Sequence, residues 1–281
     1  MAGQDDEAKP KKPSAPPHDV AQGKSDADAP EETEAPPDPN EIIQHVVKGD
    51  DGHVVQRFRT KGGDIDGEYL TYEEGKLSTR SFYTCGELEG VFEVYSPEGK
   101  LTSSMSYIRG ILDGPATIRD DSGELLQKLE YKKGLLDGVV TVYDNGLVQS
   151  RTTYAKDKKT GSFIMYGPQS KPQIESMYIN GELEGMTKVF DEEGQLLMDV
   201  PYQKGKRSGV AVEYNTLSGG IRTKTAFKND KKHGDFLEFH EDGSVRKKIV
   251  FEDGKPVGDP IEYDTKGRRL AKKDDHKDHK H

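Results

Sequence analysis

Apolar and polar residues alternate in short stretches along most of this chain. A period of two is typical of a β-strand that packs one face and exposes the other to water. Enrichment in Thr, Val, Ile, Tyr and Phe agrees with strands, and no stretch long enough for a helix interrupts the pattern. Three stretches show the alternation most clearly, with one face formed by Leu101, Ser103, Met105 and Tyr107; by Leu196, Met198, Val200 and Tyr202; and by Val245, Lys247, Ile249 and Phe251.

The stretches belong to an internal repeat. Each copy has an aromatic residue, a Gly or Asp three residues later and a Gly four residues after that. From Tyr83 to Phe251 the successive aromatic residues are 24, 24, 23, 24, 24, 25 and 24 residues apart, and a less regular copy runs through Phe58 and Gly67. This regularity predicts about nine copies of a hairpin unit. The repeat positions are exemplified by Tyr83, Gly90, Tyr107, Gly114, Tyr131, Gly138, Tyr178, Gly185, Tyr202 and Gly209.

Each copy contains a second turn, and all but one contain a second aromatic, which Arg119 replaces in the exception. After the second glycine comes a strand-like stretch that ends in an aromatic such as Tyr95 or Tyr214, and then a turn such as Pro-Glu-Gly99 or Glu-Asp-Gly243. Glycine with Asp or Asn favours such turns, because these residues tolerate positive φ or bond their own backbone. A lone hairpin buries too little surface to be stable, so copies must stack. The sequence therefore predicts an all-β, elongated repeat array of stacked antiparallel β-hairpins.

The chain ends differ from the repeats in composition. Residues 1–40 hold eight of the 15 prolines, and ten acidic residues against four lysines give them a net charge of −6. With so few apolar residues they cannot offset the entropy of ordering. We predict three regions: a disordered acidic, Pro-rich leader at 1–40, the hairpin array at 41–270, and a charged, His-rich tail at 271–281.

Targeting signals and cysteine usage bear on the compartment. No run of about 18 apolar residues is present, and the first residues lack the apolar core of a secretory signal. Cys85 is the single cysteine, which excludes an intramolecular disulfide. The sequence as written predicts a cytoplasmic protein. The alternative is a periplasmic or surface lipoprotein whose leader was removed.

The repeat resembles a known family. Its frame, Tyr-x-x-Gly-x-Leu-x-Gly-x-x-x-x-Tyr-x-x-x-Gly-x-Leu, runs directly from Tyr83 to Leu101 and nearly as closely from Tyr178 to Leu196. It is similar to the MORN-repeat variant, over about residues 49–270. Bacterial proteins of this appearance are grouped with the YwqK-type, toxin–antitoxin antitoxin-like family. The resemblance implies a scaffold of about nine MORN-like repeats of 24 residues, with antitoxin-like neutralisation of a partner as an implied association.

Sites for chemistry are sparse in the sequence. Cys85 lies in a predicted turn without a base at the equivalent place in any other copy, so we interpret it as a turn residue. The tail from Asp274 to His281 is interpreted as solvated, not as a metal site. No phosphate-binding Gly-Lys-Ser/Thr loop is present. We predict that the chain is not an enzyme and that it uses no metal, cofactor or small-molecule substrate.

Charge varies between the two glycines of the aromatic-side turn. Early copies are acidic, as in Gly86-Glu-Leu-Glu-Gly90, whereas three later copies are basic. In a stacked array equivalent turns fall on one edge, which would change from negative to positive along the array. We hypothesise that the positive part docks an anionic partner. The basic residues are Lys156, Lys158, Lys159, Lys204, Lys206, Arg207, Lys228, Lys231 and Lys232.

These features favour a non-catalytic protein-interaction scaffold. The predicted partner is another protein with an acidic segment, and an anionic lipid surface is the alternative partner. Sequence-specific nucleic-acid binding is not expected, because there is no recognition helix and the basic turns lack interleaved aromatics. Two other classes stay open: a carbohydrate or cell-wall binding repeat, and an envelope-associated lipoprotein tethered by the acidic leader.

Overall fold

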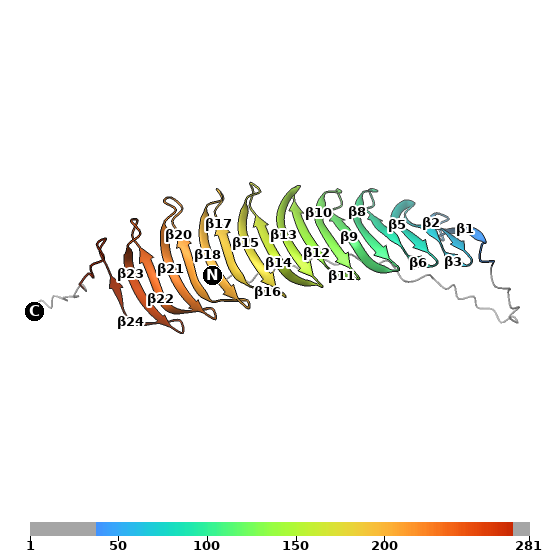
Figure 1. Cartoon of the computed structure of the whole chain (residues 1–281). Helices are drawn as coiled ribbons and strands as arrows, with labels where there is room; N and C mark the ends of the chain where they lie inside the picture. Colours follow the sequence, from blue (N-terminus) through green and yellow to red (C-terminus); the bar gives the residue numbers. More distant parts are fainter. Residues whose placement is uncertain (1–37, 272–281) are drawn as a thin grey trace, which may run out of the picture. The chain divides into compact units, whose positions relative to one another are not determined.

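The computed structural model describes residues 38–271, and every element in this range is a β-strand (Figure 1). The predicted fold class, an all-β array of stacked antiparallel hairpins, is confirmed. The predicted leader and tail lie outside the described residues, apart from residues 38–40 and 271. None of the described residues forms a helix that is long and apolar enough to cross a membrane.

The chain divides into two compact units, which we describe separately. Unit 1 ends at Gly138 and also takes in Asp144–Gly146, and unit 2 comprises Val139–Tyr143 and the chain from Leu147 onwards. The strands of unit 1 are β1 (Ile42–Lys48), β2 (Val54–Lys61), β3 (Asp64–Ile65), β4 (Gly67–Glu73), β5 (Lys76–Thr84), β6 (Glu87–Leu88), β7 (Gly90–Tyr95), β8 (Leu101–Ile108), β9 (Ile111–Arg119), β10 (Leu125–Lys132) and β11 (Leu135–Leu136).

Unit 2 repeats the same arrangement. Its strands are β12 (Gly138–Asp144), of which Val139–Tyr143 belong to the unit, β13 (Leu147–Ala155), β14 (Lys158–Tyr166), β15 (Pro172–Ile179), β16 (Glu182–Leu183), β17 (Gly185–Phe190), β18 (Leu196–Gln203), β19 (Lys206–Arg207), β20 (Gly209–Tyr214), β21 (Ile221–Lys228), β22 (Lys231–Phe239), β23 (Val245–Glu252) and β24 (Lys255–Glu262). Within each unit the strands pair antiparallel in chain order, so each hairpin is hydrogen-bonded to the next one.

The recurring spacing of aromatic and glycine has a structural cause. The second glycine of one copy pairs with the aromatic of the next copy, as Gly90 does with Tyr107 and Gly185 with Tyr202. Gly90 has a φ of +98°. The amide of the residue before it, Glu89, donates to the Phe82 carbonyl outside the register of the strand pair, so the chain bulges there. Only glycine adopts this backbone without strain. The repeat glycines are therefore fixed by backbone geometry.

The first, irregular copy differs from the prediction in one respect. Thr60 pairs with Ile65 as Tyr83 pairs with Leu88, so Thr60 rather than Phe58 occupies the aromatic position. Phe58 stacks instead between His45 and Tyr69, at ring-centroid distances of 4.6 and 5.1 Å.

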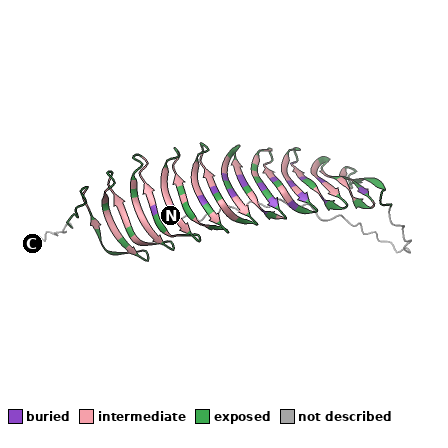
Figure 2. Ribbon diagram, in the orientation of Figure 1, coloured by how far each residue is buried: buried purple, intermediate pink, exposed green. Residues whose placement is uncertain are grey.

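One face of each sheet carries the buried side chains, and we call it the inner face. In unit 1 a row crosses neighbouring strands through Phe92, Met105, Ala116 and Leu129, with exposed fractions of 3%, 1%, 1% and 1%. Large and small side chains together fill this row, as the close packing of protein interiors requires. In unit 2 the buried apolar residues end at Ala211; β21 to β23 are mostly half-buried, and β24 is mostly exposed (Figure 2).

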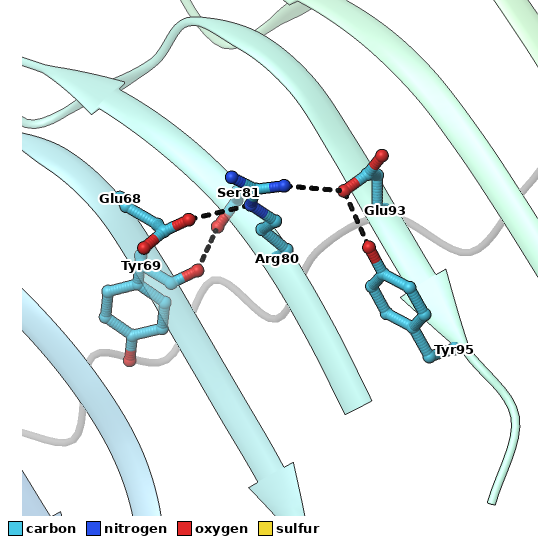
Figure 3. Close-up of polar contacts among 6 residues, drawn as sticks. All are labelled: Glu68, Tyr69, Arg80, Ser81, Glu93 and Tyr95. Atoms are coloured by element: carbon cyan, nitrogen blue, oxygen red, sulfur yellow. Dashed lines mark hydrogen bonds and ion pairs between the residues drawn. The ribbon is translucent and has the colours of Figure 1, made fainter. Parts of the chain in front are cut away.

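The opposite, outer face carries polar cross-strand contacts and the second aromatic column of the repeat. In unit 1 the Arg80 guanidinium lies between the Glu68 carboxylate, at 2.7 Å, and the Glu93 carboxylate, at 3.8 Å (Figure 3). The Tyr95 hydroxyl donates to Glu93 at 2.8 Å. Burial, and then the bond to Glu93, raises the pKa of Tyr95. The two aromatic columns of the repeat therefore lie on opposite faces of the sheet.

Candidate functional site

The basic segments lie in the tight turns that join successive copies in unit 2. Both central residues of these turns have positive φ: 49° and 73° at Lys204 and Gly205, and 49° and 68° at Asn229 and Asp230. This is the two-residue hairpin turn whose twist matches that of the strands. Gly, Asn and Asp tolerate the conformation best, which explains why Asp230 can replace the usual glycine.

Backbone bonds anchor each turn to the preceding copy. The Gly205 amide donates to the Leu183 carbonyl at 2.9 Å, and the Asp230 amide donates to the Arg207 carbonyl at 3.0 Å. The equivalent bond in unit 1 runs from Gly110 to Leu88 at 2.8 Å. The turn side chains therefore project from a backbone that the neighbouring copy holds in place.

The structure separates the nine predicted basic residues into two groups. One group is exposed at the turns, and the other is half-buried on the inner face. The exposed residues are Lys156, Lys158, Lys204, Lys206, Lys228 and Lys231, and the half-buried residues are Lys159, Arg207 and Lys232.

The half-buried cations pack on aromatic rings. They occupy the repeat position of Leu88, which is buried in unit 1. The Lys232 ammonium lies 5.3 and 5.0 Å from the ring centroids of Phe236 and Phe251, and the Arg207 guanidinium lies 4.5 Å from that of Phe227. These distances fall within the range of cation–π attraction. The sequence pattern did not reveal these contacts, because the rings lie on other strands or four residues later in the same strand.

Arg207 also joins two consecutive turns. Its backbone amide and its Nε donate to the Asp230 carboxylate, at 3.0 and 3.3 Å, and its Nη2 donates to the Asp230 carbonyl at 3.2 Å. The backbone bond from Arg207, with its guanidinium charge, holds the pKa of Asp230 below its ordinary value. Arg207 is thus engaged within the fold, and the exposed lysines carry the outward positive charge.

The acidic turns have a structural role that sequence reasoning missed. The carboxylate just before the second glycine accepts a backbone amide of the following turn: Glu89 from Arg109 at 2.8 Å, and Glu184 from Lys204 at 2.8 Å. Such charge-assisted bonds satisfy an otherwise solvated donor. The sequence signal was the recurrence of Glu or Asp at one repeat position. In the basic copies Thr, Ser or His stands there.

Lys255 extends the exposed lysines beyond the predicted set. It is exposed and follows the turn at Asp253 and Gly254, just as Lys231 and Lys206 follow theirs. Lys206, Lys231 and Lys255 therefore occupy the same place in three consecutive hairpins of unit 2, and we call them the lysine row. The predicted change from acidic to basic turns along one edge involves both units and stays a prediction.

Other candidate groups are scattered. Cys85 is exposed at the first position of a tight turn, where its φ is 50°, in agreement with its interpretation as a turn residue. Within residues 38–271 no three His, Cys, Asp or Glu side chains group as metal ligands would. An open groove of about 590 Å³ in unit 1 is lined by Val46, Arg57, Leu70 and Phe82, among others.

Comparison with known proteins agrees with the repeat architecture. The family model of the MORN repeat variant matches residues 88–109, 183–204 and 232–253. These matches support a MORN-repeat protein. Each match starts at the Leu88 position of a copy and ends at the first residue of the next tight turn, so the MORN unit corresponds to one hairpin with its bulge glycine. The third match starts at Lys232, one of the cations packed on aromatic rings.

The MORN match supports a repeat-based interaction or binding module. The prediction that the chain is not an enzyme stays a prediction. No curated protein matches the sequence. One solved structure, titled "Crystal Structure of TcdB2-TccC3-Cdc42", aligns with 82% of this chain and 15% of its own chain, at 11% identity and a TM-score of 0.18. This chain thus spans a small part of that protein, and the likeness carries no argument about function.

Proposed function

We propose that this chain is a non-catalytic interaction scaffold whose lysine row binds an acidic segment of a partner protein. The observation that carries the proposal is the exposure of Lys206, Lys231 and Lys255 at the same place in consecutive hairpins. Their backbones are held by the preceding copies, so the spacing of the three charges is set by the sheet. Repeated charge of one kind suits recognition of a repeated anionic ligand, whereas catalysis needs unlike groups that converge.

The spacing of the sheet suggests the form of the ligand. Equivalent positions in neighbouring hairpins lie two strands apart, or about 10 Å at ~4.8 Å per strand. A peptide in the polyproline II conformation advances ~3.1 Å per residue with three residues per turn, so carboxylates at every third residue lie on one side, about 9 Å apart, and would match the row. The attraction between exposed charges is weak for each pair and is screened by salt. Binding should therefore be multivalent and should fall as ionic strength rises.

The groups around Lys206 and Lys231 favour an anionic ligand, whereas Lys255 pairs with Glu252 across its hairpin. Lys204 and Lys228 add exposed positive charge at the same turns. Asp230 is engaged by Arg207, and Glu184 is engaged by the Lys204 amide, so both carboxylates have partners within the fold. Antitoxin-like neutralisation of a partner is a special case of this proposal and rests on family resemblance alone.

The test uses the full chain and a fluorescent peptide with Glu at every third residue. Substituting Lys206→Glu, Lys231→Glu and Lys255→Glu together should weaken binding at low salt by at least about tenfold. The matched control is Lys76→Glu, Lys132→Glu and Lys133→Glu, three exposed lysines of unit 1 with the same change in net charge. Fluorescence anisotropy measures both.

Equal losses in the two triple variants, or no loss in either, would contradict the proposal, because the lysine row would then add nothing beyond net charge. A second arm replaces the peptide with vesicles of phosphatidylserine and phosphatidylcholine. If the lysine-row variant loses vesicle binding while the native chain does not bind the peptide, the partner is an anionic membrane and the protein partner is excluded.

A further inference from the structure

The strand β1 forms an edge of the unit 1 sheet, and its exposed surface is unusually apolar. Among the described residues it pairs with β2 alone. Ile42, Ile43, Val46 and Val47 are between 40% and 58% exposed, and no charged residue or proline lies between residues 42 and 47. Uncovered strands of this kind tend to pair with another strand, because their outward backbone groups and apolar side chains remain unsatisfied.

The edge strand β24 of unit 2 contrasts with β1. It also pairs with one strand among the described residues, β23, but it contains Pro256 and Pro260, together with Gly258 and the charged Asp259. Proline cannot donate to a ladder, and charges on an edge oppose pairing. β1 contains no proline, and its one charge and its bulge lie at its last residue, Lys48, outside the segment from Ile42 to Val46. This difference indicates that β1, and not β24, is the edge available for pairing with another strand.

The backbone pattern of β1 shows which groups face outward. The Gly62 amide donates to the Glu41 carbonyl at 3.1 Å, in the same register that pairs Ile42 with Lys61. Hydrogen-bonded residues alternate along an antiparallel pair. Ile43, His45 and Val47 therefore direct their backbone groups toward β2, and Ile42, Gln44 and Val46 direct theirs toward the free edge.

We propose that β1 pairs with β1 of a second copy of this chain, around a two-fold axis perpendicular to the sheet. That axis keeps the inner faces on one side and makes the strands antiparallel, so residues of the same face must meet. Pairing Gln44 with the second copy's Gln44 places Ile42 opposite Val46 twice. All three pairs use outward backbone groups, and they can exchange six hydrogen bonds.

A second copy fits this edge better than a charged partner. Residues 42–46 carry no charge and set aliphatic side chains opposite aliphatic ones, while the exposed cations of the same face, Arg57, Arg59 and Lys61, lie one strand further from the axis on β2. A two-fold contact between identical edges closes at two copies, whereas pairing of β1 with β24 would generate open fibres. A groove of mixed character, lined by Val46, Leu70 and Phe82 and by the charged Arg57, Arg59 and Glu68, lies beside this edge, so an added strand would extend its wall.

The predicted association is weak. A pair of five-residue strands buries less than the ~1,000 Å² of a stable interface. Sedimentation velocity on the full chain should therefore show a monomer–dimer equilibrium with a Kd between about 1 μM and 1 mM. Val46→Lys should shift this Kd upward by at least tenfold. Val257→Lys is the matched control, because Val257 is 50% exposed on β24 and Val46 is 56% exposed on β1.

The register is tested by cysteine cross-linking in a Cys85→Ser background. Gln44→Cys should form a disulfide-linked dimer under mild oxidation, because paired residues have Cα atoms about 5.5 Å apart. Val46→Cys alone should not, since its two copies would lie four residues, or about 13 Å, out of register. A mixture of Ile42→Cys and Val46→Cys chains should cross-link again.

A chain that stays monomeric over the whole concentration range would overturn the proposal, as would a dimer that Val46→Lys leaves intact. A dimer in which Gln44→Cys fails to cross-link would also contradict it. The outcome is independent of the lysine row, because Val46→Lys lies in unit 1 and should leave peptide binding unchanged.

Discussion

Replacing Lys232 with leucine should change the stability of unit 2 by less than about 0.5 kcal/mol. Lys232 occupies the repeat position of Leu88, and its ammonium lies 5.3 and 5.0 Å from the ring centroids of Phe236 and Phe251. The cation is half-buried there. The substitution Lys232→Leu removes two cation–π contacts and returns the position to the residue type that unit 1 buries.

The magnitude follows from three contributions. Two partly exposed cation–π contacts are worth roughly 0.5–1 kcal/mol each. Full burial of a leucine side chain is worth about 1.5–3 kcal/mol, of which we take about half at this half-buried position. Exchanging the ordering cost of lysine, up to about 1.5 kcal/mol, for that of leucine, about 0.5–1 kcal/mol, recovers at most about 0.5–1 kcal/mol. At mid-range values the sum favours leucine by less than about 0.5 kcal/mol, or a Tm change of at most about 2 °C for a unit of this size.

Thermal unfolding followed by circular dichroism measures the change, and hydrogen exchange in β22 and β23 localises it. The reciprocal control is Leu183→Lys, which introduces the cation at the same repeat position and should lower the Tm. If Lys232→Leu instead destabilises the protein by 1 kcal/mol or more, lysine packs against these two rings better than leucine does. A stabilising result would indicate that lysine is retained at this position at a cost in stability.

Three further perturbations test the fold. Leu129→Ala, in the central buried row, should destabilise unit 1 by about 2–4 kcal/mol in urea unfolding, whereas Leu126→Ala, at a position 37% exposed, should change it by less than about 1 kcal/mol. Gly90→Ala should cost about 1–3 kcal/mol in the same assay, because its φ is +98°; a neutral result would refute the bulge argument. Because Asp230 has a lowered pKa in the folded state, its contribution exists above the unfolded pKa and is lost as pH falls through the folded value. Asp230→Asn should therefore reduce stability at pH 7, and the difference from the native chain should shrink toward pH 2; a constant difference would contradict the bond from Arg207.

The spacing of residues determined the hairpin array. Apolar and polar residues alternate along a strand whenever one face of the sheet packs and the other meets water. A turn or bulge that needs a positive φ favours glycine at that position in every copy. Both are local properties, so Gly90 and its equivalents could be recognised from their intervals alone. The exposure of Cys85 also followed from its position in a turn.

Cross-strand contacts could not be predicted in the same way. In the irregular first copy the sequence does not fix the strand register to within two residues. The structure places Thr60, not Phe58, at the aromatic position. The bonds from Glu89 and Glu184 to the next turn depend on how closely successive copies approach, which the packed sheet sets.

The sequence by itself determined that this chain folds into repeated β-hairpins, because periodicity and turn chemistry act within a few residues. It also showed that three copies have basic turns. The tertiary structure decided which of those cations remain available, because strand pairing brings Lys159, Arg207 and Lys232 over aromatic rings from other parts of the sheet. The same pairing leaves Lys206, Lys231 and Lys255 exposed on neighbouring hairpins, since their side chains follow the turns and not the packed face.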